Sequence, residues 1–367
     1  MRIAIDCRPL MSDKISGVEV YMLEMLKALF ELDSKNEYVL WFNNFKAVDN
    51  SAWPTDYSNV TLKHTRIPNK ILNLCMSFLR WPKVDQWIGG KIDMLWVPDP
   101  RPAPVSLACK KVITFHDLSF EDFKYAFNFK TRLWHRLLRP KKEALEADLI
   151  IAVSEFTKTQ LVQEYGVDAA KVNVIYEAAS KSLKPLDLPK SFEILQRKYQ
   201  LPDRYFLCLS TLEPRKNLKG VIQAYCSWQQ QGIHDVGLVL AGQSYPQIFA
   251  EFDLPSHPKI HLPGFIDEED KALLYQHALA FLYPSFYEGF GLPILEAMAC
   301  GTPVITSDGT ATAEVAGQAA CLVNPNDFHA ITKAMHRLYK DDFYCKQLIE
   351  AGFKRAKEFS WKKASKK

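Results

Sequence analysis

Short, nearly continuous apolar runs alternate along this chain with longer amphipathic stretches. The runs near the start are rich in β-branched and aromatic residues, which favour strands; they are RIAID (2–6), YVLWF (38–42), DMLWVP (93–98), KVITF (111–115) and LIIAV (149–153). The stretch VEVYMLEMLKALFEL (18–32) instead has the spacing of a helix with one buried face. Strands that are apolar on both faces are typical of a parallel sheet covered by helices on each side, so the pattern predicts an α/β chain.

The alternation stops once and then restarts. After VNVIY (172–176) the chain becomes rich in lysine and proline, and it resumes with YFLCLS (205–210), VGLVLAG (236–242), KIHLPG (259–264), ALAFLYP (278–284) and PVITS (303–307). We therefore predict two doubly wound, Rossmann-like domains over residues 1–180 and 204–353, joined by a linker over 181–203. Because such domains bind ligands beyond the carboxyl ends of their strands, we expect the two to face a central cleft.

Composition excludes several classes of protein. The 367 residues are 48% hydrophobic and 24% charged, as in soluble globular proteins, and a formal charge of +4 is too small to indicate nucleic-acid binding. The eight cysteines occur singly, which predicts core filling in a reducing compartment without zinc or redox chemistry. The start lacks the apolar core of a signal peptide and no window suits a spanning helix, so we expect a cytoplasmic protein.

The loop after the first strand carries a single glycine, Gly17, where a dinucleotide-binding domain has a three-glycine pattern. The loop after YFLCLS lacks that pattern too, which argues against a dehydrogenase. A lone glycine before a helix still lets backbone N–H groups approach an anion or a sugar closely, although an ordinary glycine turn explains it equally well.

Charged residues follow strands in both predicted domains. In LSTLEPRKNLKG, Arg215 and Lys216 could neutralise a diphosphate, with a solvated surface turn as the alternative. His116 and Asp117 follow KVITF, where a neutral imidazole could touch a reacting sugar or could satisfy a local turn.

The stretch YPSFYEGFGLPILEAMACGTPVIT (283–306) carries the strongest signal. A strand stops at Pro284, a glycine-rich loop follows, and a helix is expected from Leu292, whose free N–H groups would face a phosphate or sugar oxygen. Glu288 would accept hydrogen bonds from sugar hydroxyls, and Glu296 from the hydroxyl pair of a ribose. Two glutamates at this spacing are common by chance, so the surrounding residues carry the specificity.

These blocks resemble the retaining glycosyltransferases of family 4. The resemblance rests on residues 287–317, on TLEPRKN, FHDLSF and IIAVSEFTKTQL, and on the helix at Gly17, in the family's order. It implies the GT-B fold, with the acceptor bound mainly in the first domain and the nucleotide sugar mainly in the second, and metal-independent transfer with retained anomeric configuration. The end, EFSWKKASKK, resembles the segment in which a last helix, expected over 354–367, crosses back to the first domain; it stops sooner than the family pattern, as a truncated end would.

The resemblance assigns roles to matching positions. Catalytic roles fall to His116, Arg215, Lys216 and Glu288; donor binding falls to Gly17, Thr211, Arg215, Lys216, Glu288, Gly289, Phe290, Gly291, Leu292 and Glu296. It implies no metal site and no cofactor besides the nucleotide-sugar donor. The Pro-Arg-Lys-Asn subgroup resembles mannosyltransferases of polysaccharide and O-antigen assembly, which favours GDP-mannose as the donor and a glycan or a lipid-linked molecule as the acceptor. Ser210 and Thr211 stand where many members have glycine and arginine, so Arg215 is expected to supply that charge.

No side chain is clearly placed as a nucleophile. Retention is then best explained by same-face attack, in which the departing phosphate oxygen takes the acceptor's proton while Arg215, Lys216 and the helix start stabilise the leaving group. The alternatives are a GT-B sugar phosphorylase or epimerase, or a catalytically silent scaffold of a polysaccharide-assembly complex.

Two basic, aromatic segments suggest peripheral contact with an anionic membrane. The segment FEDFKYAFNFKTRLWHRLLRPKK (120–142) interleaves basic residues with Phe123, Tyr125, Phe127, Phe129 and Trp134, and RIPNKILNLCMSFLRWPKVDQW (66–87) is similar. A core-facing helix stripe with solvated cations opposite is the alternative.

Overall fold

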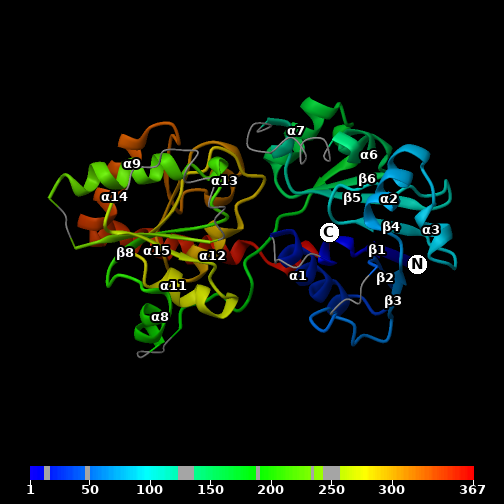
Figure 1. Cartoon of the computed structure of the whole chain (residues 1–367), viewed down its shortest axis with the longest axis horizontal. Helices are drawn as coiled ribbons and strands as arrows, with labels where there is room; N and C mark the ends of the chain where they lie inside the picture. The colour runs from blue at the N-terminus through cyan, green and yellow to red at the C-terminus, as the bar shows by residue number, and fades with distance from the viewer. Residues whose placement is uncertain (12–16, 46–49, 123–135, 187–190, 233–234, 243–256) are drawn as a thin grey trace. The chain divides into compact units, whose positions relative to one another are not determined.

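The computed structural model describes residues 1–11, 17–45, 50–122, 136–186, 191–232, 235–242 and 257–367 (Figure 1). Their contacts divide the chain into two compact units. Unit 1 comprises Met1–Glu177 and Trp361–Lys367, and unit 2 comprises Ala178–Ser360. The aromatic residues of the predicted membrane segment between Phe123 and Trp134 lie outside the described residues.

Unit 1 is built on a seven-stranded parallel sheet in the order β3-β2-β1-β4-β5-β6-β7. Its strands are β1 (Arg2–Asp6), β2 (Glu37–Asn43), β3 (Val60–Thr65), β4 (Met94–Val97), β5 (Lys110–Phe115), β6 (Leu149–Ala152) and β7 (Val172–Val174). Its described helices are η1 (Arg8–Met11), α1 (Gly17–Leu32), α2 (Asn69–Leu74), η2 (Cys75–Leu79), α3 (Val84–Trp87), α4 (Ser119–Asp122), α6 (Pro140–Glu146), α7 (Glu155–Tyr165), η4 (Ala169–Lys171) and α16 (Trp361–Ala364). The core contains Trp41, Leu95, Ile113 and Phe115, as the apolar runs predict.

Unit 2 is built on a six-stranded parallel sheet in the order β10-β9-β8-β11-β12-β13. Its strands are β8 (Tyr205–Leu209), β9 (Gly237–Ala241), β10 (Ile260–Gly264), β11 (Ala280–Tyr283), β12 (Val304–Ser307) and β13 (Cys321–Val323). Its described helices are α8 (Ser191–Tyr199), η5 (Pro214–Lys216), α9 (Leu218–Gln229), η6 (Glu268–Asp270), α11 (Lys271–Gln276), α12 (Leu292–Ala299), α13 (Thr310–Ala316), α14 (Phe328–Lys340) and α15 (Asp342–Glu358). Helix α9 packs beside α14, and α12 packs beside α15 (Figure 1).

The unit boundaries differ from the predicted ones. The predicted linker, 181–203, belongs to unit 2 where it is described, because Leu195 of α8 is buried and Lys198 pairs with Asp267 and Asp270. The returning segment begins later than the predicted residue 354, since α15 runs on to Glu358 and the chain re-enters unit 1 at Trp361. There the Trp361 ring meets the Tyr21 ring of α1 edge to face, at 5.7 Å between centroids.

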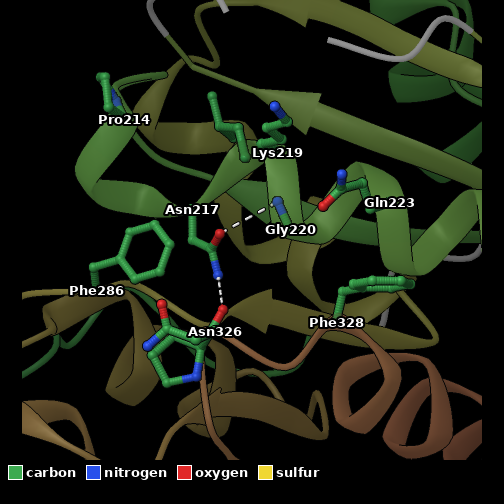
Figure 2. A pocket seen from close by; sticks show the side chains of 10 residues that line it. Pro214, Asn217, Lys219, Gly220, Gln223, Phe286, Asn326 and Phe328 are labelled. Atoms are coloured by element: carbon green, nitrogen blue, oxygen red, sulfur yellow. Dashed lines mark hydrogen bonds between the residues drawn. The ribbon is translucent and has the colours of Figure 1, made fainter.

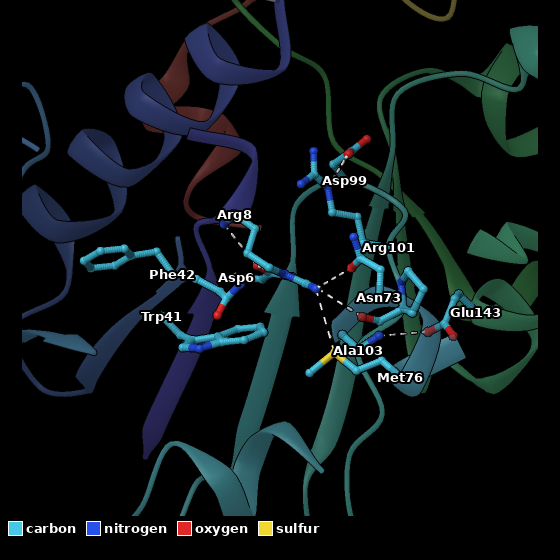
Figure 3. A network of polar contacts seen from close by, with 12 residues as sticks. Asp6, Arg8, Trp41, Phe42, Asn73, Met76, Asp99, Arg101, Ala103 and Glu143 are labelled. Atoms are coloured by element: carbon cyan, nitrogen blue, oxygen red, sulfur yellow. Dashed lines mark hydrogen bonds and ion pairs between the residues drawn. The ribbon is translucent and has the colours of Figure 1, made fainter. Parts of the chain in front are cut away.

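A buried ion pair follows β1 in unit 1 (Figure 3). Arg8 donates to both carboxylate oxygens of Asp6, with Nε to Oδ1 at 2.8 Å and a terminal nitrogen to Oδ2 at 2.5 Å. The remaining donors reach Asn73 Oδ1 and the Pro102 carbonyl oxygen, each at 3.0 Å, and the guanidinium lies over the Trp41 ring. Each nitrogen of this guanidinium therefore has a partner, and we refer to these residues as the Arg8 network.

All eight cysteines are free thiols. Within the described ranges, no helix is long and apolar enough to cross a membrane.

Candidate active site

The cationic turn after β8 is fixed in place by Asn217. This residue adopts a left-handed backbone with φ of 57°, and its side-chain oxygen accepts from the Gly220 N–H to cap α9. Its side-chain nitrogen donates to the carbonyl oxygens of Pro284, at 3.1 Å, and Pro325, at 2.6 Å. One asparagine thus ties η5 to the loops that follow β11 and β13, so Arg215 and Lys216 are presented from a rigid support.

The structure brings Arg215, Lys216 and Glu288 together within unit 2. Lys216 Nζ donates to Glu288 Oε1 at 2.7 Å, and an Arg215 terminal nitrogen donates to Glu288 Oε2 at 2.8 Å. They meet because β8 and β11 are adjacent in the sheet and their carboxyl-end loops share one edge. The Glu288 carboxylate therefore has a cation on each oxygen.

A second carboxylate, which the sequence analysis missed, also holds Arg215. Glu213 Oε1 accepts from Arg215 Nε at 3.0 Å and from a terminal nitrogen at 2.6 Å, and the Tyr287 carbonyl oxygen accepts from the other terminal nitrogen at 3.0 Å. The two cations and two carboxylates balance in charge. Arg215, which the sequence analysis expected to meet a diphosphate, is thus already paired within the protein; the only signal of this pairing was a glutamate two positions before it in TLEPRKN. We call Glu213, Arg215, Lys216 and Glu288 the Glu288 cluster.

Burial and charge act in opposite directions on the Glu288 cluster. Burial alone would raise the pKa of Glu288, but Arg215 and Lys216 lower it to about 2. Burial lowers the pKa of Lys216, and Arg215 lowers it further against the opposing effect of Glu288. Glu288 is thus ionised at neutral pH and suited to accepting hydrogen bonds rather than to donating a proton.

Tyr283, at the end of β11, is another residue that the sequence analysis did not single out. Its hydroxyl accepts a hydrogen bond from Lys216 Nζ at 2.8 Å. Burial raises the pKa of Tyr283 well above its ordinary value, so the phenol stays protonated. Tyr283 therefore orients the lysine ammonium without neutralising it.

The glycine-rich loop leads from the cluster into α12. Gly291 precedes the helix with φ of 101°, a left-handed conformation that favours glycine, and α12 begins at the predicted Leu292. Gly289 and Phe290 are buried, and the Phe290 ring meets Phe359 edge to face. The loop is thus well packed, and it places the start of α12 at the carboxyl end of β11.

Glu296 lies one turn inside α12 in surroundings unlike those of Glu288. It is partly buried, and its Oε2 accepts from the Tyr275 hydroxyl at 2.9 Å. Burial raises the pKa of Glu296, whereas the pKa of Glu288 is lowered. The two glutamates of the motif are therefore chemically distinct. Thr211, in the same unit, is exposed on the loop after β8.

His116 belongs to unit 1, where both of its ring nitrogens face acceptors. Nδ1 lies 3.1 Å from Glu177 Oε1, and Nε2 lies 2.9 Å from the Pro98 carbonyl oxygen. Only the doubly protonated ring can donate to both. Burial would lower the pKa of His116, but Glu177 outweighs it and raises the pKa above the ordinary 6.5. The imidazole that was predicted to be neutral is therefore paired at both nitrogens and has a raised pKa, and Glu177 is a partner that the sequence analysis missed.

Two remaining predicted residues also lie in unit 1. Asp117 accepts from the backbone N–H and the hydroxyl of Ser119, at the start of α4. Gly17 begins α1, and a Cβ placed on it would meet no atom of the structure within 4 Å. Among the described residues no group of three or more His, Cys, Asp or Glu side chains is arranged to hold a metal ion.

Comparisons with known proteins identify the family. Residues 15–179 match Glycosyltransferase Family 4, and residues 191–355 match Glycosyl transferases group 1. The O-antigen chain mannosyltransferase B of Escherichia coli is 34% identical over 258 residues, which cover 69% of this chain and 67% of that protein. The serotype-specific mannosyltransferase WbdA of Escherichia coli is 30% identical over 222 residues, or 59% of this chain but only 27% of that protein.

Solved structures share the fold at low identity. WaaG, a glycosyltransferase involved in lipopolysaccharide biosynthesis, aligns with a TM-score of 0.74 at 14% identity, over 99% of this chain and 97% of that chain. Sucrose-phosphate synthase from Thermosynechococcus elongatus aligns with a TM-score of 0.73 at 20% identity, over 99% and 96% of the two chains. The chain belongs to the family 4 glycosyltransferases and has the GT-B fold, which confirms the resemblance found in the sequence.

Proposed function

We propose that this glycosyltransferase moves a hexose, with mannose favoured, from a nucleotide sugar to a glycan or lipid-linked acceptor in polysaccharide or O-antigen assembly. Transfer retains the anomeric configuration and needs no metal or cofactor, GDP-mannose is the favoured donor, and the protein works on the cytoplasmic side of a membrane. The observation that carries the proposal is the Glu288 cluster at the carboxyl ends of β8 and β11. The mannosyltransferase names of its relatives support the choice of sugar.

The cluster can exchange partners when a donor binds. A diphosphate competes with Glu288 for Lys216 and Arg215, because both anions accept charge-assisted hydrogen bonds from the same nitrogens. Once released, the ionised Glu288 accepts from hydroxyls of the donor sugar. The two cations then stabilise the charge that develops on the leaving diphosphate, and its oxygen takes the proton of the attacking hydroxyl.

The second glutamate fits a different part of the donor. Glu296 has one oxygen bonded to the Tyr275 hydroxyl, which fixes the carboxylate orientation. Its second oxygen would accept from the ribose hydroxyls, while the N–H groups at the start of α12 would meet the phosphates between the two glutamates. His116 would lie beside the donor sugar.

A donor panel tests this proposal. Thermal unfolding is followed with GDP-mannose, GDP, UDP-glucose and UDP-galactose, and release of nucleotide from each donor is measured with and without oligosaccharide acceptors. Stabilisation by GDP-mannose and by GDP, but not by the UDP-sugars, and turnover with GDP-mannose alone are expected. Turnover restricted to the UDP-sugars would show that the donor is a UDP-sugar and not GDP-mannose. Binding without any turnover would favour the catalytically silent scaffold.

The membrane part of the proposal rests on one surface of unit 1. Five large apolar side chains within eleven residues of α2, η2 and the turn after them are exposed, among them Leu79 at 70% and Trp81 at 65%; the others are Ile71, Leu74 and Phe78. The inward positions of the same segment, Leu72 and Met76, are buried. The Arg139 guanidinium lies over the Phe78 ring. The segment is thus amphipathic, and the large apolar side chains exposed on its outer face support the membrane proposal.

Charge makes an anionic membrane the fitting partner for this surface. No acidic residue occurs between residues 66 and 84, whereas Arg66, Lys70 and Lys83 do. Flotation with vesicles of phosphatidylglycerol and phosphatidylcholine tests it, with Leu79→Ser/Trp81→Ser as the variant and exposed Leu107→Ser as the control. Binding that needs the anionic lipid and is lost in the double variant is expected; equal flotation of all three proteins would contradict the proposal.

A further inference from the structure

A cavity of unit 2 lies at the start of α9, and none of the roles proposed above involves it. It has a volume of about 300 Å³, at the lower end of what small-molecule ligands occupy. Its walls come from η5, the first turns of α9, the loop after β11 and the loop between β13 and α14 (Figure 2). The lining residues are Pro214, Asn217, Leu218, Lys219, Gly220, Gln223, Phe286, Pro325, Asn326 and Phe328. We call it the α9 pocket.

The lining combines aromatic rings with side chains that have spare hydrogen-bonding capacity. Figure 2 shows the Phe286 and Phe328 rings on either side of the Asn217 and Asn326 side chains. Asn217 is buried and its side chain is fully engaged within the protein. Within the part of the chain that the structure describes, the amides of Gln223 and Asn326 and the ammonium of Lys219 have no side-chain partner. These three groups line a hollow and remain available to a ligand.

This chemistry matches a sugar ring. The C–H faces of a pyranose pack on aromatic rings, whose faces carry negative partial charge. A side-chain amide offers one acceptor and two donors, which suits hydroxyl groups that both donate and accept. Gln223 is only partly exposed, so an alkyl chain packed over it would leave its amide without a partner, at a cost. The single charged lining residue, Lys219, is exposed, so the pocket does not require a charged ligand.

The α9 pocket is joined to the Glu288 cluster through its walls. Pro214 directly precedes Arg215, and the Phe286 N–H donates to the Arg215 carbonyl oxygen at 2.9 Å. Asn217, which forms part of the pocket wall, is the residue that caps α9 immediately after Lys216. A ligand in the pocket therefore rests on the same backbone turn that presents the two cations, yet it does not touch Glu288, which is absent from the lining.

We propose that the α9 pocket binds a sugar residue of the growing glycan, at a position separate from the donor. The inference rests on the proposed function, because a polymerising glycosyltransferase handles an acceptor longer than one sugar. Binding there holds the glycan on unit 2 while its end is extended, and the affinity for acceptor rises with acceptor length.

Saturation-transfer NMR on the full-length protein tests the proposal. The probes are a methyl mannoside and short linear oligosaccharides of mannose, glucose and galactose, each with and without saturating GDP. We expect one oligosaccharide series to give saturation transfer that persists with GDP. Gln223→Ala should weaken that binding about three- to tenfold, the range of one lost hydrogen bond, and Phe328→Ala should weaken it further. Phe343→Ala, which removes an exposed ring on α15, is the matched control.

The outcomes separate the pocket from the donor proposal. Loss of the signal on adding GDP, wild-type affinity in both pocket variants, or no binding by any oligosaccharide would each overturn the α9 pocket assignment. GDP-mannose stabilisation of the same proteins is read in parallel. If GDP-mannose fails to stabilise the wild type while the oligosaccharide still binds, the donor proposal fails and the pocket stands.

Discussion

The two units each place a charged turn after their first strand, and the two turns differ in how firmly their cations are held. After β1, Arg8 is enclosed by Asp6, Asn73 and Pro102, and its side chain is only 3% exposed. After β8, Arg215 and Lys216 share Glu288, and the Arg215 side chain is 17% exposed. Both turns are charge-balanced, so balance alone does not identify a binding site.

The difference lies in what could replace the partner carboxylate. Asp6 is contributed by β1 itself and is wholly buried, so no solute can take its place. Glu288 comes from a glycine-rich loop beside the N-terminus of α12, where further N–H donors are available to an anion. The Arg8 network is therefore a fixed support, whereas the Glu288 cluster is the one that we propose exchanges its carboxylate for a diphosphate.

Arg8→Ala should give the largest effect, and it should be on stability. It leaves Asp6 as a buried charge without its cation, which costs about 3–5 kcal/mol. Urea unfolding followed by tryptophan fluorescence measures this, with Arg101→Ala as the control because the Arg101–Asp99 pair is partly solvated and contributes about 0–1 kcal/mol. Equal losses of unfolding free energy in the two variants would show that the Arg8 network stabilises the fold no more than a partly solvated ion pair does.

Lys216→Ala should act on turnover. Loss of a preorganised donor to the leaving group lowers the rate about 10²- to 10³-fold. Nucleotide release from the donor measures it, with exposed Lys333→Ala of α14 as the control. Glu288 keeps Arg215 as a partner in this variant, so stability should fall less than in Arg8→Ala. A variant with full turnover would show that Lys216 has only a structural role, as Arg8 does.

Glu177→Gln should give an intermediate effect that depends on pH. The raised pKa of His116 in the folded protein means that the pair stabilises fully below the ordinary value of 6.5 and loses this contribution as the pH rises through the raised pKa. The variant should be less stable by about 1.5–3 kcal/mol at acidic pH, the range of a hydrogen bond to a charged group. The gap should close toward alkaline pH.

Urea unfolding across a pH series measures this gap. Asp99 also raises the pKa of His116, and the Tyr21 ring packs against the imidazole at 4.7 Å, so Asp99→Asn serves as the comparison. A gap of constant size across the series would mean that Glu177 acts by packing alone.

Glu213→Gln should give the smallest effect and the opposite sign. Removing one carboxylate leaves the Glu288 cluster with a net positive charge, and the partly exposed Glu213–Arg215 pair is worth about 0–1 kcal/mol. GDP should bind a few-fold more tightly and with a steeper dependence on salt, as calorimetry at two ionic strengths would detect. Weaker GDP binding would instead make Glu213 a necessary support for Arg215.

Sequence patterns predicted the central parts of both sheets and missed one edge strand of each. RIAID and YFLCLS became the central strands β1 and β8 because strands buried on both faces are continuously apolar. The edge strands β3, with the polar-rich sequence VTLKHT, and β13, with only the three residues CLV, were missed, whereas the edge strand β10 was predicted from KIHLPG.

The candidate site was predictable where a motif is local in the sequence. The loop from Glu288 to Leu292 and the Arg215–Lys216 turn could be read directly, together with the family they indicate. Glu177 could not be, because it lies 61 positions from His116 and meets it only through the fold. Its pairing also changes the expected protonation of the histidine, which no local pattern encodes.

The re-entry of the chain at Trp361 sets an order for biosynthesis. Trp361 is buried in unit 1 against Tyr21, although the 183 residues of Ala178–Ser360 separate it from the rest of that unit. At ribosomal speeds of about 5–20 residues per second, roughly 10–40 s pass between the emergence of Glu177 and that of Trp361. During this interval Tyr21 of the nascent first unit lacks its contact with Trp361. Unit 1 is thus begun first and completed only after all of unit 2 has been synthesised.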